Sequence, residues 1–65
     1  MDQDLKDSIH DILLDLTGNV PSETIIINAI NSIPSWLLST GREWGYWDTV
    51  FREDAYLFLK KFFGE

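Results

Sequence analysis

The first seventeen residues carry two opposite helical faces, and this pattern limits the fold more than any other feature of the chain. Four apolar residues recur with the three- and four-residue steps of an amphipathic helix: Leu5, Ile9, Ile12 and Leu16. At about 100° per residue, four aspartates fall within about an 80° arc on the other side of this helix: Asp4, Asp7, Asp11 and Asp15. An apolar helix face must be buried against another element, so the pattern predicts a helical domain.

The ends of this first helix are marked by local signals. It is expected to begin at Asp2 or Asp4 and to end at Leu16 or Thr17. The next residue, Gly18, favours the left-handed conformation that commonly ends a helix. Capping and the helix dipole explain acidic residues in the first turn, but they do not explain the aspartates nearer the end of the helix.

A second helix is expected from Glu23, with Ser22 as its N-cap. Three isoleucines keep a helical spacing in this segment: Ile26, Ile30 and Ile33. The β-branched run 25–27 leaves a short strand as an alternative. We favour the helix because no other segment of the chain alternates and could pair with a lone strand.

A short helix is expected from Pro34, with Gly41 as its stop. The segment from Gly41 to Trp47 is then expected to be a loop, and its sequence is Gly-Arg-Glu-Trp-Gly-Tyr-Trp. This loop holds four residues that are typical of protein-binding hot spots: Arg42, Trp44, Tyr46 and Trp47. A loop that caps the core is the plainer interpretation of the same residues, and the sequence does not decide whether Trp44 and Trp47 are buried.

The last helix is expected to follow Asp48, its N-cap, and to end at Phe62 or Phe63 before Gly64. The fold class is therefore all-α, a small single-domain bundle of three main helices plus one short helix over residues 1–65. Ten residues are expected to form the core: Leu5, Ile9, Ile12, Leu16, Ile26, Ile30, Leu37, Phe51, Phe58 and Phe62.

Composition limits the environment and the partners. The chain has no cysteine, which excludes disulfides and thiolate chemistry and favours a reducing compartment, so we expect a cytoplasmic protein. Neither a secretory signal nor an apolar run long enough to span a membrane is found in the sequence. The net charge is −6, and residues 1–33 hold six acidic residues against Lys6 alone. We therefore expect a basic protein as the partner, and neither nucleic acid nor a membrane.

The acidic stripe has three interpretations. It is a solvated face that keeps the protein soluble, a docking face for a basic protein, or a site for a divalent cation. The cation site is the weakest of the three, because residues 2–7 lack the third ligand and the glycine of a calcium loop. Of the four aspartates, Asp11 and Asp15 support the docking interpretation most, since helix energetics disfavour them where they lie.

Catalytic chemistry is not expected. His10 is the only histidine, and the nearby Ser8 lies on the other side of the predicted helix. Residues 9–18 resemble the first helix of acyl carrier proteins. The chain lacks the Asp-Ser-Leu triplet that holds the phosphopantetheine arm in that family. A second, looser resemblance, of Trp36-Leu37 and scattered later residues to sterile alpha motifs, covers fewer than twenty residues. We expect no cofactor and no metal.

The sequence thus predicts a non-enzymatic, acidic protein-binding module. The favoured function is a stoichiometric inhibitor or antagonist, of the immunity, antitoxin-like or phage-borne type, that masks a basic protein surface. Its expected partner-binding residues are the four aspartates and the four residues of the aromatic loop. The alternative is a homo-oligomeric or complex-subunit module that associates, as a homodimer for example, through the aromatic loop and the last helix.

Overall fold

The structure is a computed structural model that describes residues 2–63 of the 65-residue chain. These residues form four helices and no strand: α1 (Gln3–Thr17), α2 (Glu23–Ser32), α3 (Ser35–Trp44) and α4 (Thr49–Phe63). The all-α class is confirmed. The helix expected to be short, α3, has ten residues and is as long as α2.

The ends of α1 follow from its capping residues. The Asp2 carboxylate accepts hydrogen bonds from the backbone N–H groups of Asp4 and Leu5, which satisfies donors that the first turn leaves free. Gly18 takes a φ of 75°, and its N–H donates to the carbonyl oxygen of Leu14. The predicted end of the first helix at Thr17 is confirmed, and the helix begins at Gln3, between the two predicted starting residues.

The segment after Ser22 is helical, so the strand alternative is wrong. The Ser22 side chain accepts from the N–H of Ile25 and caps α2 as expected. The helix ends at Ser32, and the extended backbone of Ile33 leads into Pro34. Local capping therefore outweighs the β preference of the three consecutive isoleucines.

The prediction that Gly41 ends the third helix is wrong. Gly41 lies buried inside α3, which continues to Trp44, and Gly45 with its φ of 100° ends the helix instead. The reason for a glycine at position 41 is close packing. A Cβ there would lie 2.5 Å from Cδ1 of Tyr46 and 2.8 Å from Cδ1 of Phe51.

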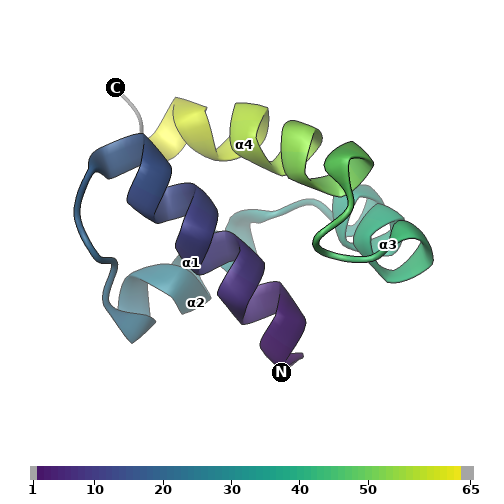
Figure 1. The fold of residues 1–65 in the computed structure, drawn as a ribbon, viewed down its shortest axis with the longest axis horizontal. Helices are drawn as coiled ribbons and strands as arrows, with labels where there is room; N and C mark the ends of the chain where they lie inside the picture. Colours follow the sequence, from purple (N-terminus) through teal and green to yellow (C-terminus); the bar gives the residue numbers. More distant parts are fainter. Residues whose placement is uncertain (1, 64–65) are drawn as a thin grey trace.

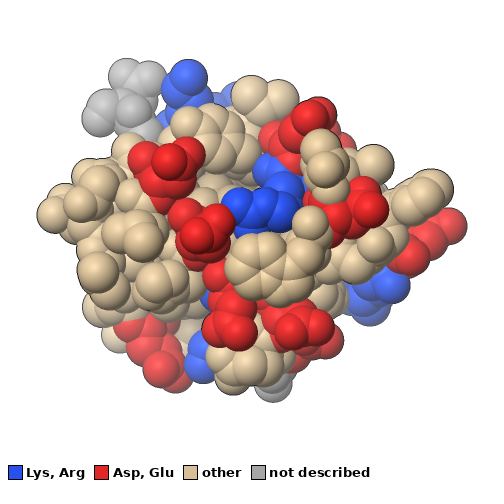
Figure 2. Space-filling model, viewed as in Figure 1, with Lys and Arg blue, Asp and Glu red and all other residues tan. Residues whose placement is uncertain are grey.

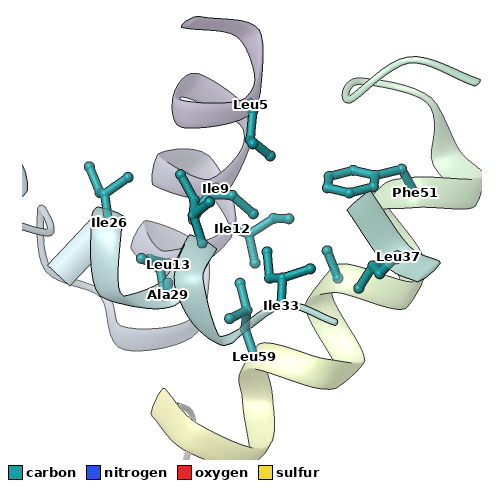
Figure 3. Packing of buried hydrophobic residues seen from close by; sticks show 12 residues of the cluster. Leu5, Ile9, Ile12, Leu13, Ile26, Ala29, Ile33, Leu37, Phe51 and Leu59 are labelled. Carbon is teal, nitrogen blue, oxygen red and sulfur yellow. The ribbon is translucent and has the colours of Figure 1, made fainter. Parts of the chain in front are cut away.

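The helices surround one apolar core. Helix α1 packs against α2 and α4, and α3 packs against α4 near its N-terminal end, away from the α1–α2 connection (Figure 1). Figure 3 shows side chains from all four helices meeting in the middle. Twelve residues are buried there: Leu5, Ile9, Ile12, Leu13, Ile26, Ala29, Ile30, Ile33, Leu37, Phe51, Ala55 and Leu59.

Seven of the ten expected core residues are buried, and three are not. Leu16 and Phe58 are partly buried against the core. Phe62 is 60% exposed, which makes its assignment to the core wrong. It lies in the last turn of α4, beyond Leu59, which is the last buried residue of the helix. The centres of the Phe62 and Phe58 rings are 5.2 Å apart. The predicted end of the helix at Gly64 lies outside the described residues.

We predict that Gly41→Ala destabilises the protein. Alanine gains about 1 kcal/mol of helix propensity over glycine, but the new methyl group meets two aromatic rings. Such overpacking costs more than the propensity returns, so a net loss of about 1–2 kcal/mol in the free energy of unfolding is expected. Urea denaturation followed by circular dichroism measures it.

The matched control for this variant is Glu43→Ala. Glu43 is exposed on the same helix, so its replacement changes helix propensity without meeting a ring. Its stability should stay within about 0.5 kcal/mol of the wild type. A Gly41→Ala protein as stable as this control would contradict the packing explanation.

Candidate functional site

The acidic stripe is present on α1 and faces solvent. Its four aspartates, Asp4, Asp7, Asp11 and Asp15, are all exposed. Figure 2 shows acidic side chains spread over the face where α1 and α4 are seen, around a basic patch in the middle. The stripe is therefore available to a partner along the whole length of α1.

The four loop residues proposed for partner binding differ in position and in exposure to solvent. Arg42 and Trp44 belong to the last turn of α3, where both are exposed. Tyr46 is half-buried, and its ring meets that of Phe51 edge to face at a centroid distance of 5.3 Å. Trp47 is 51% exposed. Tyr46 thus caps the core, whereas Trp44 and Trp47 present aromatic surface to solvent.

A fully buried hydroxyl joins α1 to the connection between α3 and α4. Ser8 has no exposed surface, and its Oγ donates a hydrogen bond of 2.7 Å to the carbonyl oxygen of Tyr46. The same Oγ accepts a hydrogen bond of 3.1 Å from Nη1 of Arg52. Both hydrogen-bonding capacities of the hydroxyl are used, so its burial is compensated.

Arg52 of α4 connects the stripe to the exposed tryptophan. Its Nη2 donates to Oδ2 of Asp11 at 2.6 Å, and its guanidinium carbon lies 5.0 Å from the centre of the Trp47 ring. A planar guanidinium can bind a carboxylate through its edge and an aromatic ring through its face. Three side chains from three parts of the chain are therefore held together on one surface.

This ion pair gives Asp11 a role that helix energetics alone does not provide. Asp7 accepts a hydrogen bond of 2.8 Å from the Gln3 amide, and Asp4 lies in the first turn, where the helix dipole favours it. Asp15 forms no ion pair with a residue that the structure describes. It is therefore the aspartate whose position the described residues leave unexplained.

Asp15 borders an open groove between α1 and α4. Seven residues line this groove: Asp11, Ile12, Leu14, Asp15, Gly18, Arg52 and Tyr56. One wall carries two carboxylates, and the other carries a guanidinium and a phenol. Within residues 2–63, no group of three or more acidic, histidine or cysteine side chains is arranged to hold a metal ion.

Ser8 and Arg52 belong to the candidate site but were not among the residues expected from the sequence. Ser8 lies beside the apolar residues of the first helix, at the edge of its buried face, which is a signal that a polar contact must be buried there. The sequence holds no comparable signal for Arg52, because its hydrogen-bond partners Ser8 and Asp11 lie 44 and 41 residues away.

Comparisons with protein-family models, with curated proteins and with solved structures find no match for this chain. In the part of the chain that the structure describes, no helix combines the length and the apolar character required to cross a bilayer.

We predict that Ser8→Ala destabilises the fold. The substitution leaves the Tyr46 carbonyl oxygen and one Arg52 N–H group without their partner, at a cost of about 1–3 kcal/mol in the free energy of unfolding. Ser39→Ala on the exposed surface of α3 is the control and should change stability by less than about 0.5 kcal/mol. Equal urea midpoints for the two variants would refute the structural role of the hydroxyl.

We predict that Arg52→Met releases Trp47. Methionine keeps an apolar stem but removes the guanidinium, so the indole loses the cation over its ring. In ¹H–¹⁵N spectra, the Trp47 indole signal should shift and its heteronuclear NOE should fall. Trp36, which is exposed on α3, is the internal control and should not change. A Trp47 signal that is unaffected would show that Arg52 does not position this ring.

Proposed function

We propose that this protein is an acidic protein-binding module that masks a basic surface on another protein and acts as a stoichiometric antagonist of it. The proposed contact surface consists of the α1 stripe and the exposed ring of Trp47. It needs no chemistry of its own, because occupation of the partner's surface is the function.

One observation carries this proposal: Arg52 contacts both Asp11 and Trp47. Exposed carboxylates alone are common on small acidic proteins and an exposed ring alone is common on any surface. Here a buried serine and an arginine hold the two features together in one fixed arrangement. A rigid aromatic residue beside charged groups is typical of binding hot spots.

The charges and the ring would act on different steps of binding. Carboxylates on one face attract a basic partner from a distance, which raises the association rate and makes it depend on salt. Burial of the Trp47 ring would slow dissociation, since aromatic anchors contribute mainly to the lifetime of a complex. Three stripe residues have no cationic partner among residues 2–63, and these are the ones that we assign to the binding partner: Asp4, Asp7 and Asp15.

The other candidate residues have different roles in this proposal. Asp11 orients Arg52, and Tyr46 fills the core beside Gly41. Arg42 and Trp44 lie on α3, and we place them outside the proposed contact surface. Arg42 in particular would oppose a basic partner.

Affinity capture from cells of the source organism tests the proposal. The baits are the wild type, Asp7→Asn/Asp15→Asn and Trp47→Ala, each washed at low and at moderate salt. The wild type should retain a basic protein that is released as salt increases. The aspartate variant should retain less of it with a weaker salt dependence, and the tryptophan variant should lose it during washing.

Two control baits separate a specific surface from general charge and hydrophobicity. Glu23→Gln/Glu43→Gln removes the same two negative charges from α2 and α3, and Trp36→Ala removes an exposed ring from α3. Both should behave like the wild type. If the stripe and Trp47 variants retain the same proteins as these controls, the proposed surface is wrong.

A further inference from the structure

The outer face of α4 carries two apolar residues that remain exposed to solvent. Val50 and Leu57 are seven residues apart, so they lie on the same side of the helix, and Leu57 is 62% exposed. In Figure 1, α4 runs along one edge of the molecule, and the other three helices all lie on the same side of it. The buried residues of α4, Phe51, Ala55 and Leu59, face the opposite direction.

Charged residues are arranged symmetrically about Leu57 on this outer face. Glu53 and Asp54 precede it by four and three positions, and Lys60 and Lys61 follow it by three and four. All four are exposed. Each acid is seven residues from the lysine on its own side of the helix, about 10 Å along the axis, which is too far for the usual pairing three or four positions apart.

None of these four charges is paired with a residue that the structure describes. The ion pairs among the described residues are Lys6 with Glu23 and Arg52 with Asp11. The face therefore presents an acidic half and a basic half around an apolar centre. When two copies of this face meet with their helices antiparallel, the acidic half of each copy lies against the basic half of the other.

We propose that a second copy of this chain docks on the outer face of α4, with the two helices antiparallel and the two Leu57 side chains in contact on the twofold axis. In this arrangement Glu53 lies opposite Lys60 of the second copy, and Asp54 lies opposite Lys61 of the second copy. The twofold axis repeats both pairs, so four ion pairs flank the apolar centre.

The charge distribution favours this face of the protein over its other faces as the place where a second copy binds. The chain carries a net charge of −6, so most of its surface repels another copy. The four charges of the outer α4 face sum to zero, which removes this repulsion locally. A twofold interface must also be self-complementary, and the order acid, leucine, lysine provides this.

The size of the face indicates a weak dimer. A standard interface buries about 800 Å² on each partner, which would be about a fifth of the 4081 Å² surface described. One helix face covers less than that, so the dimer belongs with small, transient interfaces. We expect a dissociation constant on the order of 10–100 μM. This inference does not rest on the proposed basic partner.

Sedimentation equilibrium between about 10 μM and 1 mM measures the association directly. The wild type should form dimers, and Leu57→Asp should raise the dissociation constant at least about tenfold because it places two like charges on the axis. Leu57 is exposed, so this variant should keep its circular dichroism spectrum and urea midpoint. A wild type that stays a monomer at 1 mM, or a dimer that persists in Leu57→Asp, overturns the proposal.

Charge reversal tests the antiparallel pairing. Glu53→Lys/Asp54→Lys makes the face wholly basic, and Lys60→Glu/Lys61→Glu makes it wholly acidic, so each variant alone should be a monomer. An equimolar mixture should form a heterodimer. Asp4→Lys/Asp7→Lys changes the net charge as much as the first variant but on α1, and it should still dimerise. A mixture without heterodimer, or loss of the dimer in this control, overturns the pairing.

Discussion

The buried hydroxyl of Ser8 is the contact on which the arrangement of the surface depends. It binds the backbone of Tyr46 on one side and the guanidinium of Arg52 on the other, so it fixes the α3–α4 connection and the first turn of α4 against α1. With Tyr46 held there, its ring lies on Gly41 and closes the core. With Arg52 held there, its guanidinium group donates from its free edge to Asp11 and lies over the ring of Trp47.

The parts of the fold that could be predicted from the sequence are those set by local interactions. Ser22 and Gly18 mark helix ends through hydrogen bonds to residues three or four positions away, and such bonds leave a local signature. Gly41 is also a glycine, but it is required for another reason. Two aromatic rings from a later segment of the chain approach its Cα too closely for a side chain. A glycine that ends a helix and one that admits a neighbour look alike until the packing is known.

In the candidate site, too, the locally determined features could be predicted from the sequence and the long-range contacts could not. The acidic stripe could be predicted because a helix face is a local pattern, and the structure keeps it exposed. The neighbouring aromatic residues Tyr46 and Trp47 could not be separated from the sequence, because one faces Phe51 and the other faces Arg52. The role of Asp11 also depended on Arg52, which is 41 residues away. Long-range contacts of this kind have no signature in a single sequence.

The two surfaces proposed here differ in their electrostatics, and this decides how strongly they influence each other. A basic partner on α1 would neutralise part of the acidic charge that keeps copies apart, so the two binding events favour each other without a change of shape. The described molecule measures 29 × 21 × 17 Å, and charges are screened over about 8 Å at physiological ionic strength. Physiological salt therefore screens much of the electrostatic coupling between the two surfaces. The coupling is small in physiological salt and grows as the salt concentration falls.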